Sequence, residues 1–250
     1  MYLYAFNMYA WFDKVFILND NKSKIKEWDI IQNKEWQYFL VLWENISYPE
    51  VYNTIYSSDK NFTNIYKWLL SKEAINLIHR MVYERYTTYK NVIKFFLDTE
   101  IENLLKKQTK PNKKKKPYNI RIWKYQIDWD WSFQTLIVFP DIRSYTNIIW
   151  KEKNEWTFLY SLDTQNIKNS NRWKIKTWNE SLIFTTSSEI FQDFSNLKEI
   201  YFIEPQKRYY AAQQDPRYKV GTVLEKISEN YKAKITIIDT ENLYKNTENN

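Results

Sequence analysis

LIFTTSSEIFQDFSNLKEIYFIEPQKRYYAAQQDPRYKVG is the sequence of residues 182–221, and its two short apolar runs indicate the fold class. Ser181–Phe184 and Ile200–Ile203 are bounded by polar turn residues, which is typical of buried strands in a parallel sheet. A helix is expected to follow, with one apolar stripe, and then a further strand at Ile235–Ile238. The segment therefore predicts an α/β fold with a parallel sheet. The helical stripe consists of Val220, Val223, Leu224, Ile227 and Tyr231.

Polar residues follow both predicted strands. Thr185–Ser188 comes directly after the first strand, and Glu204–Gln206 comes after the second. In open α/β sheets ligands bind outside the carboxyl ends of the strands, so this edge is the expected functional edge. Thr186 and Ser188 are the candidate nucleic-acid contacts there.

Several short motifs in this region occur in an order that resembles a known family. They are Leu136–Ile142 (LIVFPDI), Leu159–Ser161 (LYS), the pair Arg172 and Trp173, Ser188–Phe191 (SEIF), Phe194–Leu197 (FSNL), Tyr210, and Gln213–Tyr218 (QQDPRY). Together they resemble the first motor lobe of primosomal protein N prime, the bacterial replication-restart helicase. The resemblance covers roughly 136–239 and implies a RecA-like helicase lobe that uses ATP and magnesium.

The chain departs from that family at the metal site. The family strand runs into Asp-Glu-Glu-His, in which the Asp holds magnesium and the first Glu positions the attacking water. Here the corresponding residues are Ile203, Glu204, Pro205 and Gln206, so only the vestigial Glu204 survives. An isoleucine offers no oxygen ligand to Mg²⁺. Ser187 also replaces the Arg of the family's Thr-Arg-Ser.

The phosphate-binding loop is also missing. A Walker A loop needs glycines whose N–H groups wrap the phosphates, followed by Lys and Ser or Thr. Residues 122–133, where it would lie, read IWKYQIDWDWSF. Neither ATP nor magnesium is therefore expected as a cofactor, no metal site is expected, and the chain alone is predicted not to hydrolyse ATP.

The segments upstream of the lobe suggest further domains. Residues 1–58 alternate apolar runs with turns, as a small β-rich domain would, and correspond in position to the family's domain that captures a DNA 3′ end. Residues 59–105 are predicted to be a helical, winged-helix-like domain, with a candidate capping box at Thr99 and Glu102. The expected order is completed by a linker at 106–118, the degenerate lobe at 119–240 and a disordered tail at 241–250.

The net charge of +7 resides in one lysine tract. Residues 106–117 hold seven lysines and no acid, so the remaining chain is neutral. One interpretation is a solvated hinge. The other is contact with DNA phosphates, which gives salt-dependent binding without sequence preference. The candidate contacts are Lys106, Lys107, Lys110, Lys113, Lys114, Lys115 and Lys116.

Glycine and tryptophan are present in unusual numbers. The chain has 1 Gly and 12 Trp, whereas average usage of about 7% would give roughly 17 glycines. Several tryptophans, Trp28 and Trp178 among them, occupy turn-like settings where glycine is suited and where the family favours it. One hypothesis is that these codons are UGA, read as glycine in the source organism. Trp173 and Trp68 are expected to be genuine tryptophans.

Two functional hypotheses follow from the resemblance and its departures. The first is a DNA-binding replication-restart protein without ATPase activity, which binds branched or single-stranded fork DNA and contacts primosome or single-strand-binding proteins. The alternative is an ATP-dependent 3′–5′ helicase subunit for replication restart, repair and recombination, completed by a separate chain. A third possibility is a decaying gene product that binds no nucleic acid.

Other features favour a bacterial cytoplasmic protein without disulfides, a membrane segment or a metal site. The chain has no cysteine and no long apolar run, so neither disulfides nor a membrane partner is expected. The single histidine, His79, is interpreted as a structural residue of a helix. Asp128 and Asp130 are interpreted as solvated turn formers rather than a metal pair.

Overall fold

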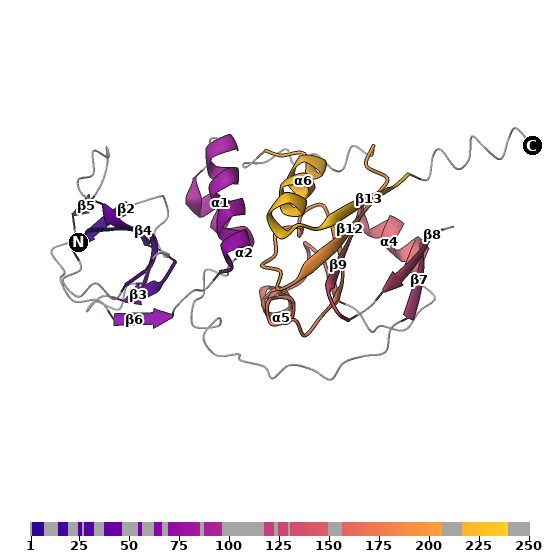
Figure 1. Ribbon diagram of the computed structural model, residues 1–250, viewed down its shortest axis with the longest axis horizontal. Helices are drawn as coiled ribbons and strands as arrows, with labels where there is room; N and C mark the ends of the chain where they lie inside the picture. Colours follow the sequence, from indigo (N-terminus) through magenta and orange to yellow (C-terminus); the bar gives the residue numbers. More distant parts are fainter. Residues whose placement is uncertain are drawn as a thin grey trace, which may run out of the picture. The chain divides into compact units, whose positions relative to one another are not determined.

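The computed structural model describes two compact units within the chain (Figure 1). One unit comprises Met1–Ser71 with Thr88–Lys90, and the other comprises Lys72–Thr87 with Asn91–Asn250. In the segments described, no helix combines the length and the apolar character needed to cross a membrane. The described residues are 2–7, 15–19, 25–26, 28–32, 38–46, 55–56, 63–66, 70–85, 88–96, 118–122, 125–129, 131–149, 157–206 and 217–239.

The N-terminal unit contains a six-stranded sheet in the order β5-β2-β1-β4-β3-β6. Its long central pair, β1 and β4, is antiparallel, and only the β2–β5 pair is parallel. Buried Ile30, Leu40 and Val41 supply apolar side chains to its interior. The strands are β1 (Tyr2–Asn7), β2 (Val15–Asn19), β3 (Ile30–Gln32), β4 (Tyr38–Ile46), β5 (Ile55–Tyr56) and β6 (Thr63–Tyr66).

The C-terminal unit is built on a five-stranded, wholly parallel sheet in the order β10-β11-β9-β12-β13. The α/β class and the parallel sheet predicted from the apolar runs are confirmed. Central strand β9 is buried along its whole length, as expected of a strand covered on both faces. The strands are β9 (Gln134–Phe139), β10 (Thr157–Leu159), β11 (Leu182–Thr186), β12 (Leu197–Ile203) and β13 (Lys234–Ile238).

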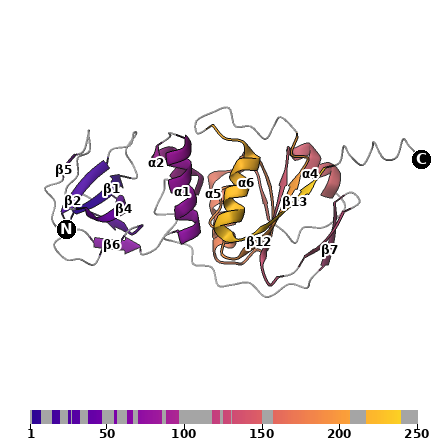
Figure 2. The same cartoon turned by 45° about the horizontal axis from the view of Figure 1, so that its top comes forward.

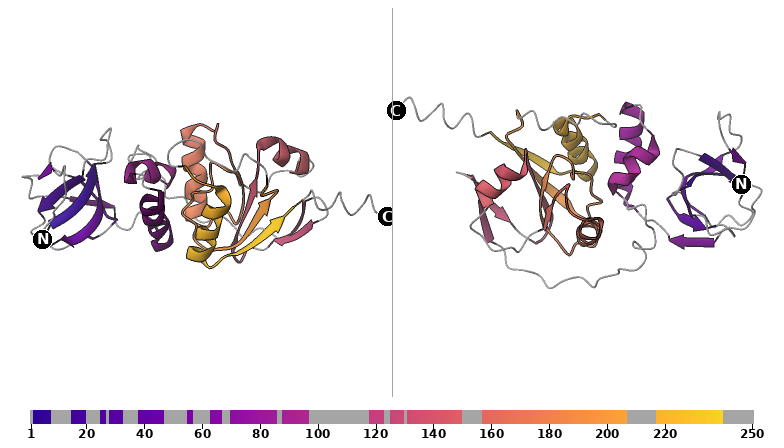
Figure 3. Two further views of the ribbon diagram at one scale, coloured as in Figure 1. Left: turned by 90° about the horizontal axis from the view of Figure 1, so that it is seen from above. Right: turned by 180° about the vertical axis from the view of Figure 1, so that it is seen from behind.

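Different elements cover the two faces of this sheet (Figure 2). Helices α5 (Gln165–Lys176) and α6 (Val220–Tyr231) lie on one face, while α4 (Ile142–Ile149) lies on the other (Figure 3). The hairpin of β7 (Tyr118–Ile122) and β8 (Tyr125–Trp129) packs on the α4 face, because Ile122 and Ile127 join the sheet's buried core there. All five residues of the predicted stripe on α6 are buried, so that helix is confirmed.

Helix α1 (Lys72–Arg85) packs against α6 within the C-terminal unit. Two ion pairs accompany the contact, Arg80 with Glu229 at 2.6 Å and Lys226 with Glu84. Helix α2 (Tyr89–Phe96) places Phe95 against Phe191, with ring centroids 4.9 Å apart. Most of the predicted helical segment therefore shares a unit with the α/β lobe.

Several sequence expectations fall wholly or partly outside the described residues. The capping box at Thr99 and Glu102 lies outside them, as do the candidate contact lysines between Lys106 and Lys116. Asp130 lies outside as well, but Asp128 belongs to strand β8, where it pairs with Asn119. The expectation that Asp128 sits in a turn is therefore wrong, because this residue is part of an antiparallel strand pair.

Candidate functional site

The candidate site is the carboxyl edge of the parallel sheet in the C-terminal unit. Strand β9 continues into α4 on one face, whereas its neighbour β12 leads to α6 on the opposite face (Figure 3). The connections therefore diverge between these two strands, which is the position where open α/β sheets bind ligands. The segments that follow β11 and β12, predicted as functional loops, both lie at this edge.

An ion-pair cluster centred on Glu189 follows β11. Lys168 Nζ lies 2.9 Å from Glu189 Oε1, and Arg172 Nη2 lies 3.8 Å from Glu189 Oε2. The three side chains are only 10–17% exposed, so these interactions are screened less than surface pairs. Lys168 Nζ also donates to the carbonyl of Ser161, 2.7 Å away, and so links the loop after β10 to the turn after β11.

Tyr218 borders this cluster. Its hydroxyl donates to the carbonyl of Ser187 over 3.4 Å, and its ring meets Phe191 edge-on with centroids 5.1 Å apart. Burial, with a smaller contribution from the negative charge of Glu189, raises the pKa of Tyr218 to about 12. The phenol therefore stays neutral at physiological pH and serves as a hydrogen-bond donor.

Residues from four separate motifs meet in this arrangement. Ser161 belongs to the LYS motif, Arg172 to the Arg-Trp pair, Glu189 to the SEIF motif, and Tyr218 ends the QQDPRY motif. Each makes a hydrogen bond or an ion pair within the Glu189 cluster or with the adjoining turn. The fold therefore brings together residues from four stretches that are far apart in the sequence.

The two candidate contacts after β11 differ in accessibility. Thr186 is only 7% exposed and ends the strand, so little of its side chain is open to a ligand. Ser188 lies in the following turn and is partly exposed. The neighbouring Thr185 hydroxyl is buried and donates to the Thr186 carbonyl at 3.0 Å. Ser188 is thus the more accessible of the two predicted residues.

The position of the family's magnesium-binding aspartate is part of the hydrophobic core. Ile203 has no exposed surface and belongs to the buried cluster that includes Ile137, Phe139 and Ile238. A hard cation needs oxygen ligands, and this aliphatic side chain supplies none. The residues present therefore do not fit the magnesium ion that the resemblance implies.

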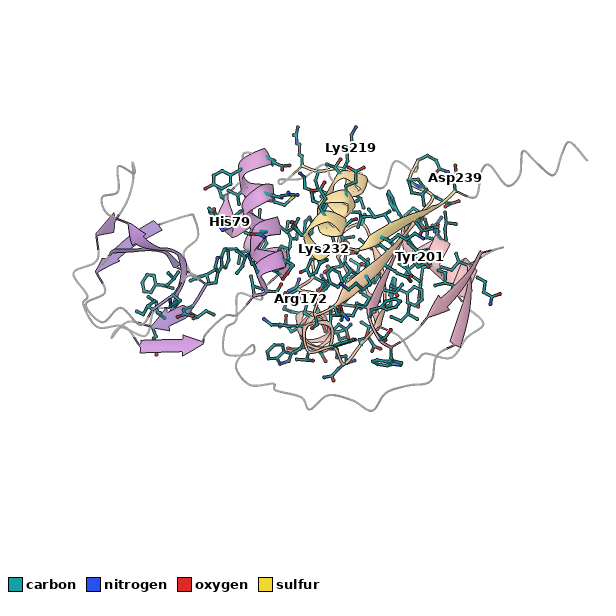
Figure 4. The ribbon with its side chains drawn as sticks, viewed as in Figure 1. His79, Arg172, Tyr201, Lys219, Lys232 and Asp239 are labelled. Carbon is teal, nitrogen blue, oxygen red and sulfur yellow. The ribbon has the colours of Figure 1, made fainter. Side chains whose placement is uncertain are left out.

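Glu204 directly follows this core position in an unusual conformation. Its φ is 49°, in the left-handed region, and its amide donates to the carbonyl of Ile238 over 2.8 Å. Nearby, Gln206 Nε2 donates to Asp239 Oδ1 over 3.1 Å. Figure 4 shows Asp239 at the carboxyl end of β13, opposite the end that carries Lys232. The backbone hydrogen bond to Ile238 thus anchors Glu204 to β13 at the candidate edge.

Asp141, which follows β9 at the same edge, caps a helix. Its Oδ1 accepts from the Ser144 amide at 2.9 Å, and its Oδ2 accepts from the Ser144 hydroxyl at 3.2 Å. This is the arrangement of an N-cap aspartate on α4. Over the described segments, no three His, Cys, Asp or Glu side chains group so as to hold a metal ion.

His79 lies on α1, away from the carboxyl edge. Burial lowers its pKa, and its ring stacks on Tyr83 with centroids 6.4 Å apart. These contacts support the structural interpretation of the single histidine.

Sequence reasoning missed Lys168 and treated Glu189 and Tyr218 only as parts of motifs. Glu189 could have been found, since it is the acidic residue of the SEIF motif and follows the polar run 185–188 after a predicted strand. Lys168 gave no signal, because it is one of three lysines in a polar helix. A comparison of the chain with protein-family models found no match, and a comparison with curated proteins also found none.

Proposed function

We propose that this chain is a DNA-binding protein of replication restart that acts as a binding module and not as an ATP-driven motor. DNA with single-stranded or branched structure is the proposed ligand. Other replication-restart or single-strand-binding proteins are the proposed protein partners. The lysine tract at 106–116 provides the charge for phosphate contact, and the carboxyl edge of the sheet provides the second contact surface.

One observation carries this proposal. Residues of four motifs that resemble the restart helicase gather around Glu189, whereas Ile203 occupies the metal position from within the core. The first part supports kinship with a DNA motor lobe. The second argues against magnesium-dependent phosphoryl transfer, since that reaction relies on electrostatic stabilisation by the metal.

Fork-DNA binding at two salt concentrations tests the proposal. Full-length protein should bind the fork, and its affinity should fall as salt rises, because Lys–phosphate contacts release counterions. Replacing Lys113–Lys116 with glutamine should weaken binding and flatten the salt dependence. Fork binding that is absent at low salt would refute the DNA-binding proposal.

The matched control removes four lysine charges from the amino end of the sheet. Lys174, Lys198, Lys232 and Lys234 are exposed and lie near the amino ends of the strands. Their simultaneous replacement with glutamine should leave the salt dependence close to that of the unmodified protein. An equal loss in both variants would show that net charge alone, rather than the tract, controls binding.

The same assay with ATP and magnesium separates the binding module from the helicase alternative. Affinity that is unaffected by nucleotide is expected, because Ile203 cannot hold the metal. Unwinding that requires ATP and is abolished in Glu204→Gln would instead establish a motor.

A further inference from the structure

Two tryptophans of this chain adopt a backbone conformation that is usual for glycine. The 12 tryptophans and 1 glycine already depart from average composition. Positive φ angles occur in the described residues at Trp28 (65°), Trp178 (56°), Glu204 (49°) and Lys232 (53°), and at no glycine. For a bulky aromatic residue this region is a true outlier, since its Cβ crowds the backbone.

Trp178 occupies the glycine position of a Schellman motif. Helix α5 ends at Lys176, and Thr177 is its C-cap. The Trp178 amide donates to the Ile175 carbonyl at 3.1 Å, and the Asn179 amide donates to the Lys174 carbonyl at 2.8 Å. This pair of hydrogen bonds defines the motif. The residue directly after the C-cap, here Trp178, is left-handed in this motif and is usually glycine. The indole at this position is 37% exposed.

Trp28 occupies a similar position in a tight turn before β3. The Asp29 amide donates to the Lys26 carbonyl at 3.2 Å, and the Lys26 amide donates to Asp29 Oδ2 at 2.9 Å. The Trp28 amide itself reaches the Val41 carbonyl at 2.6 Å, so its backbone is held between the turn and β4. Such a backbone fixes a positive φ, which glycine adopts without steric cost.

The one glycine stands where glycine is not needed. Gly221 lies in the first turn of α6 and has no positive φ. A Cβ added to it would meet Phe202 at 3.5 Å, which is an ordinary van der Waals contact. Neither backbone conformation nor close packing therefore requires glycine there, although glycine is unfavourable within helices.

Trp173 provides an internal contrast. It lies inside α5 without a positive φ, and Lys176 Nζ stands 5.9 Å from the centre of its ring. This is an ordinary setting for a tryptophan. The conformational anomaly is therefore confined to some tryptophan positions and is not a property of every one.

We infer that Trp28 and Trp178 are glycine positions, encoded by UGA codons that the source organism reads as glycine. Trp173 is a true tryptophan encoded by UGG. The natural chain then has glycine at positions 28 and 178 and carries no steric strain at either position. This inference rests on backbone conformation and composition, and it is independent of the proposed function.

The coding DNA and the mass of the natural protein test the inference directly. UGA is expected at codons 28 and 178, and UGG at codon 173. Tryptic peptides 27–34 and 177–198 from the source organism should each be lighter by the difference between a tryptophan and a glycine residue. UGG at codons 28 and 178, or peptides of the tryptophan mass, would overturn it.

Thermal unfolding of recombinant variants provides a second test. The unfolding midpoint should rise if positions 28 and 178 are glycine positions and fall if their tryptophans are genuine. Trp28→Gly and Trp178→Gly should each raise the midpoint of thermal unfolding, because glycine removes the left-handed strain. Trp173→Gly, the control inside a helix, should lower it. Trp28 is only 3% exposed, so a genuine core tryptophan there would give a large loss on Trp28→Gly. A lowered midpoint in both turn variants would contradict the inference.

Discussion

The two edges of the parallel sheet both contain buried polar groups, but they use them differently. At the amino edge, Gln134 is fully buried and all its side-chain hydrogen-bonding capacity goes to the backbone. At the carboxyl edge, the partners of Glu189 are charged side chains, and all three remain slightly exposed. The first arrangement is typical of a structural clamp. The second leaves charge near the surface, where a ligand can meet it.

The amino-edge clamp joins three connections. Gln134 Nε2 donates to the carbonyls of Ile175 at 2.8 Å and Glu180 at 2.9 Å. Its Oε1 accepts from the amides of Ser195 at 2.8 Å and Asn196 at 3.0 Å. One side chain therefore satisfies groups that would otherwise be buried without partners. The comparison teaches that burial of polar groups alone does not identify a functional edge.

The largest expected effect comes from breaking the clamp. Gln134→Ala should lower the free energy of unfolding by about 3 kcal/mol, because buried backbone donors and acceptors lose their partners. Urea denaturation measures this loss, and fork-DNA affinity of the folded variant should not change. Gln206→Ala, which removes an exposed side chain with one hydrogen bond to Asp239, is the control and should have little effect. A large change in DNA affinity with Gln134→Ala would erase the distinction between the edges.

A substitution at the carboxyl edge should cost less stability than Gln134→Ala but should change the affinity for fork DNA. Glu189→Gln should destabilise the protein by about 2 kcal/mol, since Lys168 and Arg172 are left with a neutral partner. The same two cations should become available to DNA phosphates, so fork binding should tighten several-fold at low salt. Denaturation and binding assays on one preparation measure both effects.

Asp193 offers the matched control for that variant. Its Oδ2 lies 3.1 Å from Lys176 Nζ, its side chain is 7% exposed, and the pair lies at the end of α5 near the amino edge. Asp193→Asn should therefore cost similar stability without altering DNA affinity. Equal changes in affinity for both variants would show that the two edges do not differ in function.

Alkaline pH should destabilise the protein, because the buried phenol of Tyr218 at the carboxyl edge must then ionise. Tyr218 has a pKa of about 12 when folded and an ordinary value of 10.0, so the folded state holds this proton more tightly. The stability it contributes is complete below pH 10 and is lost as pH rises toward 12, by about 2 kcal/mol. Tyr218→Phe should remove that part of the alkaline loss in denaturation experiments at pH 9–12. Phenylalanine at exposed Tyr83 should leave the loss as it is.

The smallest expected change in stability is at Lys232, which follows the C-terminal end of α6 near the amino edge of the sheet. Lys232 has a φ of 53° after α6, and the Ala233 amide donates to the Ser228 carbonyl at 2.9 Å. Lys232→Gly should stabilise the protein by about 1 kcal/mol, since glycine relieves the left-handed strain. Lys232→Ala removes the same charge without relieving that strain and should not stabilise. Thermal unfolding of both variants measures the strain of a left-handed residue at a helix end, and the result can be compared with that for Trp178, whose φ is 56°.

Much of the C-terminal unit could be predicted from local patterns. The apolar runs at 181–184 and 200–203 identified β11 and β12, and the stripe on 220–231 identified α6, because buried strands and helices impose their own spacing. The polar residues after β11 and β12 were correctly placed at the carboxyl edge of the sheet, because parallel strands end at the same edge. The short strands β5 and β6 carried too few residues for any period to be recognised.

The composition of the candidate site was less predictable. Lys168, Glu189 and Tyr218 are far apart in the sequence, and nothing in their spacing shows that they meet. Their juxtaposition depends on the strand order, which places β11 between β10 and β9. Gln134 was missed for a similar reason, because its four partners come from two distant turns and the end of a helix.

The sequence by itself determined the α/β class, the parallel strands with their polar ends, and the imbalance of tryptophan over glycine. These properties are local, since they depend on residue type and short-range spacing. Only the tertiary structure decided which polar groups share an edge, that Ile203 belongs to the core, and that Trp28 and Trp178 are left-handed. The physical reason is that burial, ion pairing and turn geometry depend on neighbours that the chain brings together only when it folds.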